Sequence, residues 1–165
     1  MTPNQEIRVV LKAIRKIERA LDIHSRHLNK ESGLTLPQLI VLRCVRDLGE
    51  PSGNAIARDV DLSPPTVLGI LDKLSAKGLI ERQRLPTNRR VVISRLTEQG
   101  AHVLKSAPSP LGETFSRRFF ALQPEERQVI INSLEKVAEF SGDETVERLA
   151  EVMDLPVAES AQEPH

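Results

Sequence analysis

Aromatic side chains are nearly absent from this sequence, which has four phenylalanines and no tryptophan or tyrosine among its 165 residues. Proteins that bind RNA or single-stranded DNA rely on aromatic rings on which bases stack. The composition therefore argues against that class of binder. It also argues against an aromatic cage for a quaternary ammonium ligand, because such a cage needs several rings.

Paired cysteines and long apolar runs are absent as well. The single cysteine, Cys44, excludes an internal disulfide, which is typical of a protein in a reducing environment. No stretch approaches the roughly 18 apolar residues that a membrane-spanning helix needs. Charges interrupt the first 22 residues, so they do not form the apolar core of a signal peptide. We expect one cytoplasmic domain that does not enter a membrane.

Catalytic and metal-binding signatures are also missing. We find no nucleophile–base pair and no phosphate-binding loop, so we expect neither an enzyme nor a cofactor. His24 and His27 have the spacing of two metal ligands on a helix, but surface or interface packing is the preferred interpretation. Cys44 lies in an apolar segment without a nearby cation, which favours a buried, inert thiol over a redox sensor.

The net charge is zero, but the charges are unevenly distributed. Residues 1–51 carry nine basic and six acidic side chains (+3), residues 52–97 carry eight and four (+4), and residues 98–165 carry six and thirteen (−7). A basic segment inside a neutral chain indicates a module that binds a polyanion.

Apolar residues at three- and four-residue steps predict a long helix from Gln5 to about Glu31, which Gly33 ends. The same periodicity predicts a second helix over Leu34–Leu48. Glycine and proline follow that helix directly, at positions 49 and 51, and end it.

The middle of the chain predicts two short helices and a hairpin. Ser52 is a suitable N-cap for a helix to about Val60, and Ser63 for a helix that Gly78 ends. Residues 79–85 and 90–96 favour extended structure on either side of a Pro-Thr-Asn turn.

The last third of the chain predicts more helices and a tail. Thr97 would cap a helix that extends to Ala121, which Pro108 and Pro110 must kink or interrupt. Another helix starts near Gln123. Residues 155–165 contain too few apolar side chains to pack and are expected to be disordered.

The second of the two capped helices has the right surface to enter duplex DNA. Its core side is apolar, while the opposite side is built from small and polar residues: Ser63, Pro65, Thr66, Gly69 and Lys73. Such a face fits a major groove about 12 Å wide and can contact base edges.

The hairpin that follows gathers four arginines within twelve positions, from Arg84 to Arg95, around its turn. Charge in an exposed hairpin can serve only solubility. This hairpin, however, directly follows a helix that fits the major groove. Arg84, Arg89 and Arg90 are therefore suitably placed to contact phosphates or to enter the adjacent minor groove.

The segment LSPPTVLGILDKLSAKGLIERQRLPTNRRVVISRLTEQG resembles the winged helix-turn-helix of the MarR family of bacterial transcription regulators. The upstream LTLPQLIVLRCV is similar to that family's second helix, and the resemblance covers about residues 5–142. It implies a mainly α-helical fold with a small β-hairpin wing. In that family the first helix and the last two helices build a homodimer, and two winged lobes bind a palindromic operator.

The resemblance also implies a division of the chain. Residues 5–33 would form an N-terminal dimerisation helix, and residues 34–97 the winged helix-turn-helix lobe. Residues 98–154 would form the C-terminal dimerisation helices, followed by the tail of residues 155–165.

Carried over by position, Ser63, Pro65, Thr66 and Lys73 would lie on the recognition helix, and Arg90 would be the wing arginine that enters the minor groove. This chain departs from the family at Asn88, where an aspartate is usual. An aspartate can orient arginines through charge-assisted bonds, whereas asparagine supplies a neutral acceptor. The departure predicts a looser wing tip or another residue that holds Arg90.

A narrower resemblance lies in the first helix. AIRKIERALDIHSRHLNKESGLTLPQL is similar to the MarR-type regulators of compatible-solute (ectoine) synthesis, chiefly through DIHSRHLNKESGLT. It implies control of osmolyte genes, relieved by ionic strength or an osmolyte.

Taken together, these features predict a homodimeric repressor that binds double-stranded DNA. A small effector or the ionic conditions would release the protein from the DNA. The alternative is a winged-helix protein-interaction module without specific DNA binding. Phe115, Phe119 and Phe120 are expected in core and dimer contacts, and Arg117 and Arg118 on a solvated face.

Overall fold

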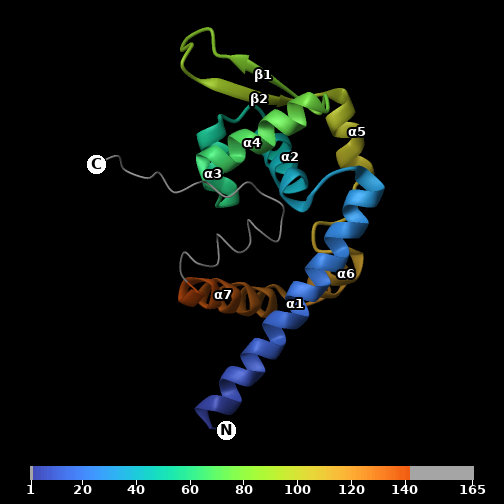
Figure 1. Ribbon diagram of the computed structural model, residues 1–165, viewed down its shortest axis with the longest axis vertical. Helices are drawn as coiled ribbons and strands as arrows, with labels where there is room; N and C mark the ends of the chain where they lie inside the picture. Colours follow the sequence, from blue (N-terminus) through green and yellow to red (C-terminus); the bar gives the residue numbers. More distant parts are fainter. Residues whose placement is uncertain (1, 142–165) are drawn as a thin grey trace, which may run out of the picture.

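The computed structural model describes residues 2–141, which form seven helices and one two-stranded hairpin. Figure 1 shows an extended arrangement in which the hairpin and α2–α4 occupy one end. Helix α1 leads away from that end toward the N-terminus, and α6 and α7 are seen at the part of the molecule away from the hairpin. The mainly helical fold with one hairpin confirms the predicted fold class.

Helix α1 (Pro3–Ser32) is long and mostly exposed. It begins at Thr2, whose capping box involves Gln5, and it ends at Gly33, which adopts the left-handed conformation (φ 68°). Leu28 is its one buried residue. The helix therefore joins the core only near its C-terminal end, and the rest of its apolar stripe is left uncovered.

Three helices enclose the core of the lobe that carries the hairpin: α2 (Leu36–Leu48), α3 (Gly53–Val60) and α4 (Pro64–Ala76). Side-chain oxygens cap all three at the positions Thr35, Ser52 and Ser63. The fully buried side chains at the centre of this core are Leu39, Val41, Leu42, Val45, Ile56, Val67, Leu71 and Leu74.

The hairpin consists of β1 (Ile80–Arg84) and β2 (Val92–Leu96), paired antiparallel with Ile80 opposite Leu96 and Arg84 opposite Val92. Its base is attached to the lobe because the Ser94 N–H donates to the Pro51 carbonyl at 2.9 Å. The wing therefore leaves the lobe from a fixed position next to the start of α3.

Helices α5 (Glu98–Ser106) and α6 (Glu113–Phe120) replace the single helix that was expected to reach Ala121. The chain leaves helical conformation at Ala107, and Gly112 has a φ of 82°. The two prolines of this segment interrupt the helix rather than kink it, because neither can donate the backbone hydrogen bond that continues a helix.

Helix α7 (Pro124–Ser141) completes the described chain, close to the predicted start at Gln123. The predicted tail, residues 155–165, and the end of the predicted segment 98–154 lie outside the described residues. Phe120 is 69% exposed and Phe115 is also exposed, so the prediction that these two rings are core residues is wrong for the single chain.

Candidate nucleic-acid interface

The N-terminus of α4 is held by two hydroxyl groups. Ser63 Oγ accepts a hydrogen bond from the Thr66 backbone N–H at 3.3 Å, and it lies 2.7 Å from Thr66 Oγ1. Pro64 occupies the first turn, where its missing N–H has no cost. The two hydroxyls are thus engaged with each other, which leaves less of their bonding capacity for DNA than the sequence suggested.

Helix α4 buries one side and exposes the other. Val67, Ile70, Leu71 and Leu74 pack into the core. Among the residues predicted for the recognition face, Ser63, Pro65 and Lys73 are exposed, whereas Thr66 and Gly69 are half-buried. The predicted face is therefore outside the core, as groove binding requires.

The wing tip is closed by the backbone and by Asn88. Leu85 N–H donates to the Val91 carbonyl at 3.0 Å, and Asn88 N–H donates to the Leu85 carbonyl at 3.2 Å. The Asn88 side-chain oxygen accepts a hydrogen bond from the Arg90 backbone N–H at 3.1 Å. Asparagine therefore acts on the backbone of Arg90 rather than on its guanidinium group, and the tip has a defined turn without a carboxylate.

The arginines of the hairpin fall into two groups. Arg82 bonds to Asp72 of α4, and Arg95 Nη2 lies 2.6 Å from Glu50 Oε1. Within the described chain, the exposed guanidinium groups of Arg84, Arg89 and Arg90 pair with no carboxylate. Two arginines thus attach the wing to the lobe, and three remain available for phosphates.

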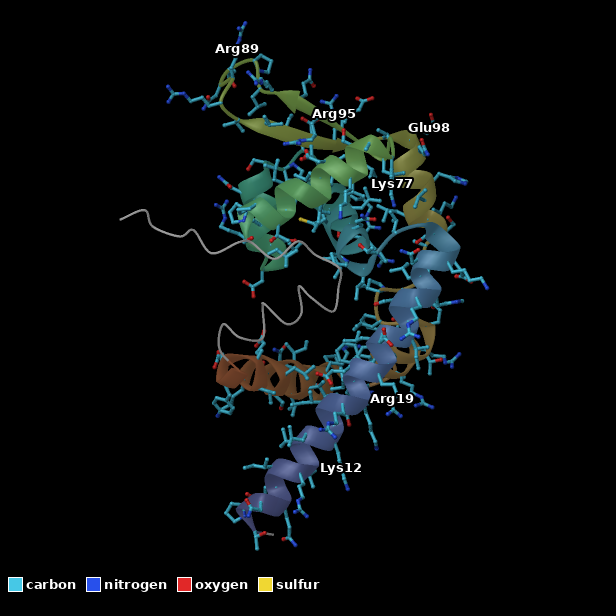
Figure 2. All side chains as sticks on the ribbon, viewed as in Figure 1. Lys12, Arg19, Lys77, Arg89, Arg95 and Glu98 are labelled. Carbon is cyan, nitrogen blue, oxygen red and sulfur yellow. The ribbon has the colours of Figure 1, made fainter. Side chains whose placement is uncertain are left out.

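These free guanidinium groups lie toward the outer part of the hairpin. Figure 2 shows the side chain of Arg89 directed away from the rest of the molecule at the wing tip, whereas Arg95 lies near the base of the hairpin, close to α4. A basic tip that projects from a fixed base can follow a DNA backbone beside the groove that α4 enters.

Two structural residues of this site were not predicted. Arg82 joins the wing to the recognition helix through Asp72, a pair that no sequence pattern indicates because it depends on tertiary packing. Lys77, at the end of α4, donates to the carbonyl of Gly33 and to Gln38 Oε1. It connects the recognition helix to the α1–α2 junction.

Leu68 was also missed, although the sequence held a signal for it. This leucine is 48% exposed on α4. It stands outside the i, i+3, i+4 spacing of the buried residues of that helix, so its exposure follows from the same periodicity that predicted the core.

Cys44, His24 and His27 each have contacts within the protein. Cys44 is buried, and burial, together with a hydrogen bond to Asp59, raises the pKa of its thiol to about 12. His24 Nε2 donates to the Ser109 carbonyl at 2.6 Å, and His27 lies 3.3 Å from Glu31. In residues 2–141 no three histidine, cysteine, aspartate or glutamate side chains converge as metal ligands would.

The site as a whole is an exposed surface that can bind another molecule. A capped helix, an attached wing and unpaired guanidinium groups can bind a charged duplex. None of the helices in the described part of the chain is long and apolar enough to cross a membrane.

Comparison with known proteins places this arrangement in a family. Residues 34–92, which include α2, α3, α4 and β1, match the MarR family model. A transcriptional repressor of Pseudomonas putida, NicR, is 30% identical over 104 residues, which cover 63% of this chain and 66% of NicR. An HTH-type transcriptional regulator of Mycobacterium leprae, ML2140, is 24% identical over 127 residues, 77% of this chain and 86% of that protein.

Among solved structures, Bordetella bronchiseptica BpsR, described in a study of how 6-hydroxynicotinic acid regulates its DNA binding, is 26% identical with a TM-score of 0.61. The likeness covers 79% of this chain and 91% of BpsR. Because both curated relatives are named as transcriptional regulators, the matches are also consistent with a chain that is not an enzyme. The fold, the exposed recognition helix and these matches identify the chain as a DNA-binding transcriptional regulator of the MarR family, with a winged helix-turn-helix.

Proposed function

We propose that this protein is a homodimeric repressor that binds a pseudo-palindromic operator in double-stranded DNA. The observation that carries the proposal is the contrast within the hairpin: among residues 2–141, Arg82 and Arg95 pair with carboxylates, whereas Arg84, Arg89 and Arg90 do not. Unpaired guanidinium groups beside an exposed recognition helix suit phosphate and groove contacts.

In the proposed complex, α4 enters the major groove with Ser63, Pro65, Thr66, Gly69 and Lys73 toward the DNA. Lys73 is exposed and supplies a positive charge to this face. Arg84 and Arg89 contact phosphates, and Arg90 enters the adjacent minor groove, whose negative potential attracts arginine.

The uncovered apolar surface supports the homodimer. Large exposed apolar side chains occur along three helices of the single chain: Ile7, Val9, Val10, Leu11, Ile17 and Ile23 on α1, Phe115 and Phe120 on α6, and Val129, Ile130, Ile131, Leu134, Val137 and Phe140 on α7. Patches of this extent on a water-soluble protein mark interaction surfaces. In a C2 dimer, the same patch of each subunit covers the other.

Charge supports the same interface. The first two-thirds of α1 is rich in basic side chains, at Arg8, Lys12, Arg15, Lys16 and Arg19. Figure 2 shows Lys12 and Arg19 on the part of α1 that extends from the lobe. Helix α7 carries four carboxylates, at Glu125, Glu126, Glu135 and Glu139. Opposite charges on the two helices favour their association within or between subunits.

Release from DNA would follow from a change in how the two lobes are held. Arg43 of α2 supports such a control point, because its Nη2 donates to the Pro108 carbonyl at 3.3 Å and its buried Nε has no hydrogen-bond partner in the described structure. A small effector that pairs with Arg43 would alter the contact between the lobe and the α5–α6 connection. NicR is named as a transcriptional repressor, which supports repression. The DNA binding of BpsR is described as regulated by 6-hydroxynicotinic acid, which supports release by a small effector.

The resemblance of the first helix to ectoine regulators supports osmolyte synthesis or uptake genes as the targets. Affinity for DNA falls steeply with salt because phosphate contacts release counterions. Ionic strength or an osmolyte is therefore the proposed releasing signal. The rival function, a winged-helix interaction module that does not bind DNA, is less favoured because the relatives are named as transcriptional regulators.

A gel-shift titration with the DNA upstream of the protein's own gene tests the proposal. We expect retention of one fragment at moderate salt in the presence of excess scrambled duplex, and footprinting should then show two symmetric half-sites. Equal retention of the scrambled duplex would contradict operator recognition and favour the interaction module.

A further inference from the structure

Leu68 is an exposed apolar residue on the outer side of the recognition helix. Its side chain is 48% accessible, whereas its neighbour Val67 is fully buried. Leu68 lies three residues after Pro65, which is also exposed, so the two share one side of the helix. The N-terminal half of α4, the part that contacts base edges in helix-turn-helix proteins, thus presents an apolar surface.

The polar groups around Leu68 are engaged within the protein. The Asp72 carboxylate, one helical turn further on, is bonded to Arg82 of the wing. The Ser63 and Thr66 hydroxyls are bonded to each other at 2.7 Å. The N-terminal half of the recognition helix therefore has few free side-chain groups with which to read bases through hydrogen bonds.

Gly69, next to Leu68, has no internal reason to be glycine. A Cβ built at this position meets no atom of the described residues within 4 Å. Glycine in the middle of a helix is less stable than alanine by roughly 0.5–1 kcal/mol. Open space combined with an unfavourable residue indicates that a surface outside the chain approaches the helix backbone here.

We propose that Leu68 is a specificity-determining residue that contacts the 5-methyl group of a thymine in each half-site, and that Gly69 allows α4 to approach the bases closely enough for this contact. The inference rests on the proposed function, DNA binding through α4. The thymine methyl is the apolar group that base edges present in the major groove, and it is the natural partner for an exposed leucine there.

The test removes methyl groups from the DNA and the leucine from the protein. In the footprinted operator duplex, each thymine is replaced in turn by deoxyuridine, which lacks only the methyl. Burial of one methyl-sized group strengthens binding by about fourfold. We expect one symmetry-related thymine position at which deoxyuridine weakens wild-type binding about fourfold per half-site, measured by fluorescence anisotropy.

The Leu68→Ala variant should bind the normal operator more weakly and should lose its sensitivity to deoxyuridine at that same position. Leu48→Ala is the matched control, because Leu48 is equally exposed, at 48%, on a different helix. It should retain the deoxyuridine sensitivity of the wild type. Gly69→Ala should raise the melting temperature while weakening operator binding.

Two results would overturn the inference without affecting the proposed function. One is selective operator binding that no deoxyuridine substitution weakens. The other is a Leu68→Ala protein that keeps the wild-type response at every thymine. Failure of the proposed function would differ from both, because the wild-type protein would then not distinguish the operator from scrambled duplex.

Discussion

At the scale of single residues, the important distinction is between arginines that hold the wing and arginines that can bind DNA. All of them lie in one basic segment of the sequence, and nothing in their spacing separates them. The ion pairs with Asp72 and Glu50 remove Arg82 and Arg95 from the set that is free to contact phosphates. Arg84, Arg89 and Arg90 remain, and the following prediction concerns one of them.

Arg90→Ala should weaken operator binding by about 1–3 kcal/mol, or roughly 5- to 150-fold, if its guanidinium group is a groove contact. Fluorescence anisotropy at fixed salt measures the loss. Arg95→Ala is the matched control, since an exposed ion pair contributes only about 0–1 kcal/mol to stability and Arg95 is already paired with Glu50. Equal losses in the two variants would contradict the division of roles.

Asn88, two residues before Arg90, gives a second prediction for the wing tip. Asn88→Asp keeps an acceptor for the Arg90 backbone N–H, so operator affinity should stay equal or increase. Asn88→Ala removes that acceptor and should weaken binding by loosening the turn. A large loss in the aspartate variant would show that this wing binds DNA in its own way.

At the scale of elements, the position of α5 depends on a close contact between its first turn and the hairpin. A Cβ added at Gly100 would lie 2.1 Å from the Leu79 carbonyl oxygen and 2.8 Å from Leu96 Cδ1. Because the first of these atoms belongs to the backbone, the clash cannot be relieved by a rotamer change. Helix α5 can therefore dock here only with glycine.

Gly100→Ala should lower the free energy of unfolding. The usual cost of an overpacked site is about 1–3 kcal/mol, and we expect a loss near the upper end of that range. Urea denaturation followed by circular dichroism measures it. Gly69→Ala, the same substitution in a helix with open space among the described residues, should instead be stabilising. An unchanged urea midpoint for Gly100→Ala would mean that α5 does not pack against Leu79 as described.

At the scale of the whole molecule, three helices expose many large apolar side chains. Most of α1, α6 and α7 contributes no buried side chain to the described structure, and Leu134 alone is 51% exposed. A single chain thus encloses the core of the DNA-binding lobe but leaves its longest helices uncovered. This imbalance is the physical basis for the proposed dimer.

Leu134→Glu should convert the protein from dimer to monomer and lower operator affinity, because a carboxylate buried in an apolar interface is costly without a partner. Analytical ultracentrifugation at micromolar concentration measures the oligomeric state. Asn132→Glu adds the same charge two residues earlier on α7, at a side chain that is already polar, and should remain dimeric. A monomeric wild-type protein would contradict the proposal directly.

The sequence by itself determined the local features of this protein. The caps at Ser52, Ser63 and Thr97 and the end of the first helix at Gly33 were readable because each depends on atoms within about four residues along the chain. The buried stripe of α4 followed from its periodicity. The order of these elements, together with the resemblance to the MarR family, predicted the winged fold.

Only the tertiary structure decided which side chains are free. The pairs Arg82–Asp72 and Arg95–Glu50 join residues 10 and 45 positions apart, and such contacts depend on how helices and strands pack. The exposure of Phe120 was also settled in three dimensions, whereas the break between α5 and α6 follows locally from the two prolines. Local interactions determine where a helix begins and ends, but packing determines which of its surfaces is left to bind a partner.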